Sequence, residues 1–167
     1  MSWETGSERI QDLINGGELS QVPPDAELAR RMLTDAGRHL ATAAAAESTG
    51  DLPGAYQLAY DALRKSAAGL LEAQGLRATS RGGHIAVQDA VTAQFGSTIR
   101  ALRSFSRIRR ARNSFEYPST EAPGPSGDDV KDAIRVAREV HDAAGRSAAP
   151  PAGWPPRYSR STPRSFS

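Results

Sequence analysis

Residues 109–117 read Arg-Arg-Ala-Arg-Asn-Ser-Phe-Glu-Tyr, and Pro118 stops the helical pattern that this stretch completes. We place residues 99–117 on one helix that turns about 100° per residue. Its broad apolar face then carries Ile99, Leu102, Phe105, Ile108 and Phe115. Arg109, Arg112 and Glu116 fall inside this apolar face. The pattern therefore predicts charged side chains where the helix contacts the rest of the protein.

A buried charge is costly unless it is paired. Arg112 and Glu116 are four residues apart, so they can pair along one helix. The resulting polar cluster has two interpretations, because it either stabilises the bundle or forms a functional site.

The composition favours closely packed helices over a sheet. The chain has 167 residues, 38% of them hydrophobic, and it is rich in alanine and poor in aromatic residues. This length suits one domain with a real core. The chain contains no cysteine, which excludes disulfides and thiol chemistry.

The periodicity of apolar residues predicts five further helices, at about 7–15, 24–47, 51–75, 84–95 and 128–146. Asp51 is suited to cap the third helix. Asp61, Lys65 and Glu72 fall opposite its apolar face, and we expect Asp61 and Lys65 to form an exposed pair. Residues 77–83 read as a loop. We predict an all-α, up-and-down bundle of five to six helices.

The last residues differ in composition from the bundle. Residues 147–167 are rich in proline, serine, alanine and arginine, with Trp154, Tyr158 and Phe166 spaced too widely to build a core. We expect one domain over residues 1–146 and a disordered tail over 147–167.

Positive charge is concentrated although the net charge is only +2. Residues 97–117 carry six arginines and the single acid Glu116. A basic stripe of this kind is typical of a site for a polyanion, but it also describes a helix face that water solvates. The candidate phosphate-binding residues are Arg103, Arg107, Arg109 and Arg110.

Several classes of site have no sequence signature in this chain. It has no phosphate-binding glycine loop, no His-Glu-x-x-His and no Cys/His metal set, so we expect neither a metal nor a cofactor. It has no apolar run of the roughly 20 residues that span a bilayer. Its N-terminus lacks the pattern of a signal peptide, so we expect no membrane contact and a cytoplasmic location.

Four segments together resemble the HEPN superfamily of small helical-bundle proteins, in an arginine-rich, actinobacterial-type branch. They are residues 59–65, 70–77, 83–84 and 112–117, and the likeness covers roughly residues 8–145. The resemblance implies an up-and-down bundle that forms a homodimer. Many members act on or near RNA. A nucleotidyltransferase-like partner protein, encoded by a neighbouring gene, would favour an RNA-associated function for this chain.

The ribonuclease motif of that superfamily is an arginine, usually followed by a polar residue, with a histidine four to six residues after the arginine. Carried over to this chain, Arg112 matches the arginine and Asn113 the polar residue, but Tyr117 stands in the place of the histidine. Tyrosine is a poor base unless its pKa is lowered, as Arg109 and Arg112 could do. Glu116 is a second candidate base, although pairing with Arg112 would weaken it.

The candidate catalytic residues are therefore Arg112, Asn113, Glu116 and Tyr117. Three functions remain open: an RNA-associated protein of a toxin–antitoxin or defence-type system, a non-enzymatic dimerisation module, and a bundle that binds a small ligand. The first is supported by the basic helix and the second by the missing histidine. We predict RNA binding with weak or no metal-independent cleavage.

Overall fold

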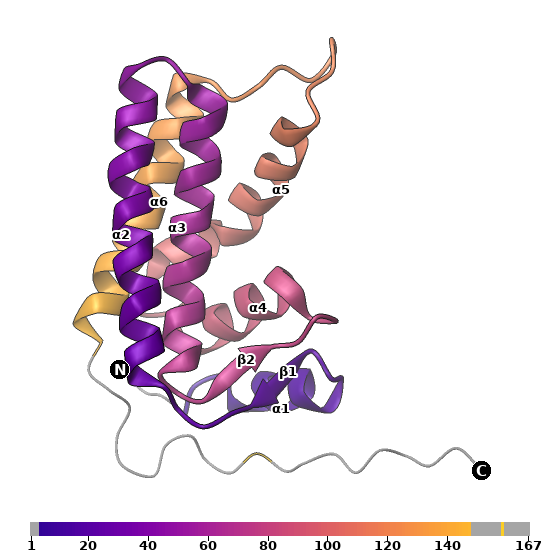
Figure 1. Ribbon diagram of the computed structural model, residues 1–167. Helices are drawn as coiled ribbons and strands as arrows, with labels where there is room; N and C mark the ends of the chain where they lie inside the picture. Colours follow the sequence, from indigo (N-terminus) through magenta and orange to yellow (C-terminus); the bar gives the residue numbers. More distant parts are fainter. Residues whose placement is uncertain (1–3, 148–157, 159–167) are drawn as a thin grey trace.

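Three long helices, α2 (Ala26–Ser48), α3 (Leu52–Glu72) and α6 (Gly127–Arg146), stand side by side in the computed structural model (Figure 1). The structure describes residues 4–147 and residue 158. The other elements are α1 (Ser7–Asn15), β1 (Leu19–Gln21), β2 (Leu76–Ala78), α4 (Gly83–Phe95), the 3₁₀-helix η1 (Arg100–Ser104) and α5 (Phe105–Glu116). The predicted all-α bundle is confirmed.

The long helices begin where polar side chains can accept hydrogen bonds from the free N–H groups of the first turn. Asp25 accepts from the Leu28 amide at the start of α2, and Asp51 accepts from the Gly54 amide at the start of α3. The predicted cap at Asp51 is thus confirmed. Ser126 forms a reciprocal capping box at the start of α6.

Helix α3 forms the centre of the core because its small residues let neighbouring helices approach closely. It packs against α2 and α6. Its buried Tyr60 meets the ring of Phe105 from α5 edge-on, with 6.4 Å between the ring centres. Ala59, Ala62 and Ala67 are fully buried.

A layer of α1, the two short strands and α4 closes one end of the bundle (Figure 1). β1 and β2 pair antiparallel, with Leu19 opposite Ala78. The prediction of a loop over residues 77–83 was therefore wrong for its first two residues. A strand of three residues has no periodicity to detect, and this one forms because a segment almost 60 residues earlier supplies its partner.

The prediction of one continuous helix over residues 99–117 was also wrong. Residues 100–104 form η1, and the α-helical part begins only at Phe105. A 3₁₀-helix turns about 120° per residue rather than about 100°, which changes the direction of the side chains before Phe105. Ile99, Leu102, Phe105 and Ile108 are nevertheless buried, as predicted.

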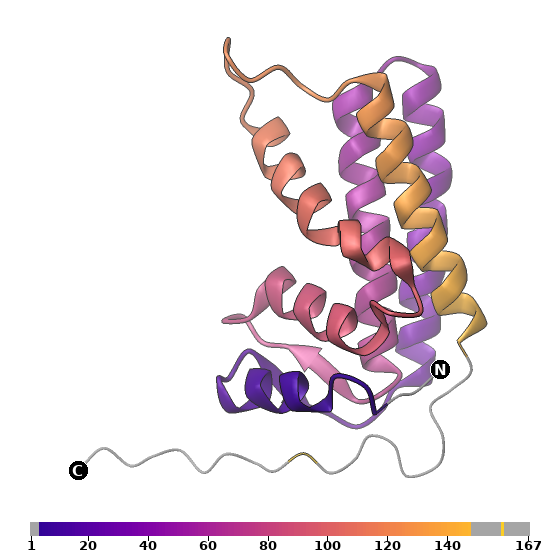
Figure 2. The same ribbon diagram turned by 180° about the vertical axis from the view of Figure 1, so that it is seen from behind.

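Helix α5 starts against the bundle and leans away from the three long helices toward its end, and the loop that follows returns to α6 (Figure 2). Near its end, Phe115 packs edge-on against Tyr56 of α3 at 5.0 Å between ring centres. Arg107 forms an ion pair with Asp132 of α6 at 2.6 Å. These contacts fix which side of α5 faces α3.

Most of the predicted disordered tail, residues 148–157 and 159–167, lies outside the described residues. Tyr158, which the structure describes, is buried with 8% of its surface exposed. The last helix, α6, ends at Arg146. None of the helices in the described part of the chain combines the length and hydrophobicity of a membrane-spanning segment.

Candidate functional site

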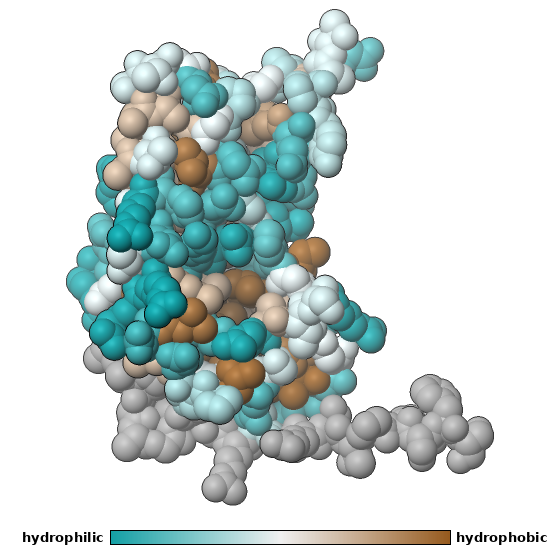
Figure 3. Space-filling model, in the orientation of Figure 1, coloured by the Kyte–Doolittle hydropathy of each residue, from teal (hydrophilic) through white to brown (hydrophobic). Residues whose placement is uncertain are grey.

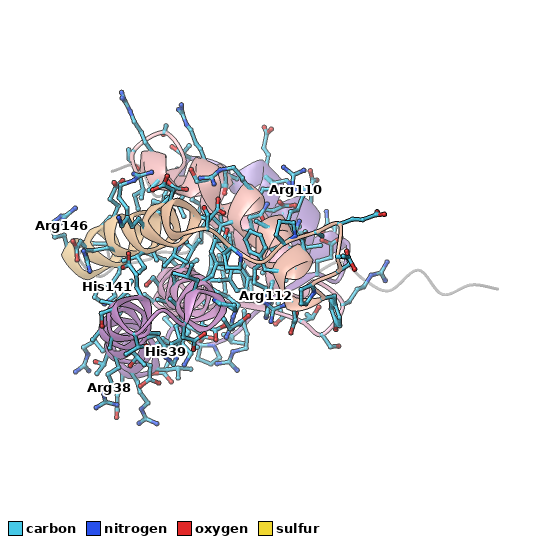
Figure 4. The ribbon with its side chains drawn as sticks, turned by 90° about the horizontal axis from the view of Figure 1, so that it is seen from above. Arg38, His39, Arg110, Arg112, His141 and Arg146 are labelled. Carbon is cyan, nitrogen blue, oxygen red and sulfur yellow. The ribbon has the colours of Figure 1, made fainter. Side chains whose placement is uncertain are left out.

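Arg112 projects from α5 toward α3, whereas Arg110 lies on another side of the helix (Figure 4). The Nε of Arg112 donates to Gln57 Oε1 of α3 at 2.7 Å, and its Nη1 lies 2.8 Å from Glu116 Oε2. Its guanidinium carbon is 5.5 Å from the ring centre of Tyr60, within cation–π range. The pairing predicted between Arg112 and Glu116 is therefore present.

The arginine–glutamate pair is not fully buried. The side chain of Arg112 is 23% exposed and that of Glu116 is 43% exposed. An incoming anion can therefore reach the guanidinium group and compete with the carboxylate for it.

His84 lies beside Tyr60 and joins α4 to this part of the molecule. The Tyr60 hydroxyl and His84 Nδ1 are 3.1 Å apart, and which of them donates depends on the histidine tautomer. Their ring centres are 6.0 Å apart. Tyr60 is 1% exposed, so Nδ1 of His84 faces a buried hydroxyl group.

The environment of the two rings shifts both of their pKa values. Burial lowers the pKa of His84, and the charges of Arg64 and Arg112 lower it further, while Asp61 opposes them. Burial raises the pKa of Tyr60, although the same arginines oppose that shift. At neutral pH His84 is therefore an uncharged proton acceptor and Tyr60 keeps its proton.

Two further guanidinium groups flank this pair of rings. Arg64 of α3 lies 3.8 Å from Asp61 Oδ1, a distance longer than a hydrogen bond. The Nε of Arg109, on α5, donates to Gln88 Oε1 of α4 at 3.0 Å. Both charges act on Tyr60 and His84. We call Tyr60, Arg64, His84, Arg109 and Arg112 the central cluster.

Not every candidate catalytic residue of the sequence belongs to the central cluster. Asn113 is exposed, and its Oδ1 accepts from Nη1 of Arg112 at 3.2 Å. Tyr117 follows the last residue of α5, and its side chain is 79% exposed. Glu116 contacts the cluster through Arg112 alone among the contacts recorded for the described residues.

The predicted phosphate-binding arginines are distributed over several surroundings. Arg109 lies in the central cluster, but Arg103 donates from Nε to the Gly96 carbonyl at 3.2 Å and Arg107 is held by Asp132. Arg110 is exposed. The structure thus brings Arg109 and Arg112 together with Arg64, and leaves the other three on the outer side of η1 and α5.

Two expectations about α3 were wrong. Asp61 lies nearest Arg64 rather than Lys65, whose Nζ contacts His39 Nε2 at 2.8 Å. Glu72 is 3% exposed instead of facing solvent. Both of its carboxylate oxygens accept from Arg77, at 2.6 and 3.0 Å, because β2 brings that arginine back over the end of α3.

The residues that sequence reasoning did not select are Gln57, Tyr60, Arg64, His84 and Gln88. They come from α3 and α4, and the apolar periodicity gave Tyr60 a core position. His84 entered the sequence analysis as the start of a helix and within the HEPN-like segment 83–84, but not as a site residue, since a lone histidine has no local pattern. Its contact with Tyr60, 24 residues earlier, could not be read from spacing.

The family model of the HEPN domain matches residues 29–147, which is most of the chain. The chain belongs to the HEPN family. No curated protein and no solved structure matches it significantly. The matched region contains the central cluster, all but the first three residues of α2, and all of α3 through α6.

In this HEPN domain a histidine does lie near Arg112, but it comes from a different helix. The resemblance placed the family histidine at the position of Tyr117, which is exposed. His84 of α4 instead contacts Tyr60, whose ring lies against Arg112. Within residues 4–147 and residue 158, no three His, Asp or Glu side chains are arranged to hold a metal ion.

Open space adjoins the central cluster at both ends. A cavity of about 550 Å³ lies between the start of α3 and the end of α5, with Gln57, Arg112 and Phe115 among its walls. A second cavity of about 400 Å³ has Arg64 and His84 in its wall. The cluster can therefore contact a ligand that extends in either direction along α3.

Proposed function

We propose that this HEPN protein is an RNA-associated component of a toxin–antitoxin or defence-type system and holds an RNA phosphate at the central cluster. The observation that supports this is the convergence of Arg64, Arg109 and Arg112 around the Tyr60–His84 pair. Guanidinium groups bind phosphate oxygens through paired N–H donors. Asp61 and the partly exposed Glu116 balance only part of this charge.

His84 is the group in the cluster best suited to take a proton during RNA cleavage. Metal-independent cleavage removes the proton of a 2′-hydroxyl, whose oxygen then bonds to phosphorus while the bond to the 5′-oxygen breaks and that oxygen gains a proton. Tyr60 has a raised pKa, Glu116 is paired with Arg112, and Tyr117 is exposed. We therefore assign the base to His84 and the phosphate contact to Arg112.

The test measures binding and cleavage of single-stranded RNA by matched variants. Arg112→Ala should weaken binding more than Arg38→Ala, which removes the same charge from an exposed position on α2 (Figure 4). Loss of one charge-assisted contact corresponds to roughly tenfold weaker binding. Equal effects of the two variants would show that the protein contacts RNA through its general charge and would contradict a phosphate site at Arg112.

The same assay separates the two candidate bases. Where the wild-type protein cleaves RNA, His84→Asn should abolish cleavage and Tyr117→Phe should leave it unchanged. The reverse result would assign the base to Tyr117. RNA binding by the wild type without cleavage would mark a binding protein in which His84 does not act on the ribose.

The second candidate function is a non-enzymatic dimerisation module, which the exposed side chains of Tyr117 and Ile85 favour. They are 79% and 50% exposed, so contact with a second copy would remove apolar surface from water. In the RNA-associated proposal the protein is a cytoplasmic homodimer that works with a nucleotidyltransferase-like partner protein. If the wild-type protein forms a dimer but neither binds RNA nor arrests growth on expression, the RNA-associated proposal is wrong and the dimerisation module is the function that stands.

A further inference from the structure

The second cavity, of about 400 Å³, lies where α2 and α3 meet β2 and α4. Hydrophobic side chains gather in this part of the face that Figure 3 shows. The apolar wall consists of Leu28, Met32, Ala68, Leu71, Leu76 and Val87. A mostly apolar cavity of this size with a few polar groups is typical of a site for a small organic group.

Among the polar groups of the cavity, the Nε of Arg64 is buried and has no hydrogen-bond partner among the described residues. The others are already paired or lie at its edge. Glu72 is buried, but both carboxylate oxygens accept from Arg77. The Thr79 hydroxyl donates to the Gly17 carbonyl at 2.6 Å. The exposed Ser80 lies at the edge. Apart from Arg64, the cavity therefore favours an uncharged group over an ion.

The cavity adjoins the central cluster because Arg64 and His84 belong to both. Arg64 and Ala68 are four residues apart on α3, so they lie on the same face about 6 Å apart along the helix axis. A phosphate held by Arg64 and Arg112 would thus have the apolar cavity as its immediate neighbour. This combination matches a nucleotide, in which one sugar joins a charged phosphate to a flat base.

We propose that this cavity is a subsite for an unpaired nucleobase of the RNA whose phosphate lies at the central cluster. The inference rests on the proposed function and adds a substrate preference to it. A base that enters the cavity must leave its helix, so the site selects single-stranded over double-stranded RNA. The charge of Arg64 in the cavity wall favours a nucleotide over an apolar peptide or lipid chain.

The test fills the cavity and measures binding of a short, fluorescently labelled oligoadenylate. Ala68→Leu adds three carbons to the cavity wall and preserves helix propensity. We expect it to weaken binding by roughly tenfold, since a base excluded from the cavity no longer buries its apolar surface against the aliphatic wall. Ala46→Leu, at a partly buried position on α2 outside the cavity, is the matched control and should bind like the wild type.

An abasic oligonucleotide with the same backbone distinguishes the subsite from the phosphate site. It should bind the wild type and Ala68→Leu with equal affinity, and the wild type should bind it less tightly than oligoadenylate. If oligoadenylate and the abasic strand bind equally and Ala68→Leu changes neither, the base subsite is wrong while the phosphate site stands. If neither strand binds, the proposed function itself fails.

A second variant guards against a folding defect in Ala68→Leu. Met32→Trp fills the cavity from α2 at a position that is only partly buried, and thermal unfolding of both variants verifies the fold. Weaker oligoadenylate binding by both folded variants supports the subsite. Unchanged binding by a folded Met32→Trp, or equal affinity for single-stranded and duplex RNA, would overturn it.

Discussion

At the scale of single residues, His84 matters more than its position in the sequence indicates. It is the second residue of α4, and one ring nitrogen contacts the buried hydroxyl of Tyr60. The arginines of two other helices act on its charge. The pKa of His84 therefore depends on the charges of the central cluster.

We expect Arg64→Met to raise the pKa of His84 toward its ordinary value, because one of the positive charges that disfavour its protonation is removed. Titration of the histidine ring signals by NMR measures this change. Arg38→Met, which removes a charge from an exposed site on α2, is the control and should leave the pKa of His84 where it is. An unchanged pKa in Arg64→Met would show that Arg64 does not act on His84.

The lowered pKa of His84 also predicts how stability depends on pH. Because the folded-state pKa lies below the unfolded-state value, the unfolded chain binds more protons as the pH falls through that value. This contribution therefore destabilises the protein on acidification from neutral pH. Urea unfolding at several pH values should show a smaller loss in His84→Asn than in the wild type, and equal losses would contradict the prediction.

At the scale of one element, α5 presents its two sides differently to its surroundings. Arg112 faces α3, whereas Arg107 reaches Asp132 on α6 and Arg110 is exposed. The three arginines lie within six consecutive residues of one helix. The three residues are of the same type, so it is the packing of α5 that makes Arg112 a candidate phosphate ligand. Arg107 and Arg110 belong to the outer surface for the same reason.

The pair of Arg112 and Glu116 stabilises α5 only modestly, since both side chains are partly exposed and Gln57 also binds Arg112. We expect Glu116→Ala to lower the free energy of unfolding by about 1 kcal/mol or less. Removing one partner of a fully buried pair would instead lower the free energy of unfolding by about 3–5 kcal/mol. Urea unfolding of the wild type, the two single variants and the double variant measures the coupling, and strictly additive losses would show that the residues do not interact.

At the scale of the whole molecule, the prediction of a homodimer through the region of α5 concerns a surface rather than a single site. HEPN domains commonly form dimers, and Tyr117 leaves α5 with an exposed ring. A symmetric pair would bury the same patch on both copies. The contact would also lie next to Arg112, five residues earlier on the chain.

We expect Tyr117→Arg to shift a dimer toward monomer, because two like charges would then face each other across the symmetry axis. Sedimentation velocity over a range of protein concentrations measures the shift. Ala41→Arg adds the same charge to an exposed position on α2 and should leave the dimer intact. A wild-type protein that stays monomeric at high concentration would contradict the prediction.

Features that depend on neighbouring residues could be read directly from the sequence. Apolar spacing predicted the helices, Asp51 was expected as a cap, and a four-residue spacing predicted the pair of Arg112 and Glu116. Each of these interactions spans only a few residues of one helix, so local geometry decides it. The likeness of four segments was also enough to indicate the HEPN family.

The central cluster depends on how separate helices pack. Gln57 meets Arg112 across 55 residues of chain, and Tyr60 meets His84 across 24. The pairing of β1 with β2 likewise joins distant segments. Nothing in the spacing of one segment specifies such a contact, since it arises only when α3, α4 and α5 bury their apolar faces together. The sequence alone thus determined the helices and the family, whereas tertiary packing decided that His84, and not Tyr117, lies beside the arginines.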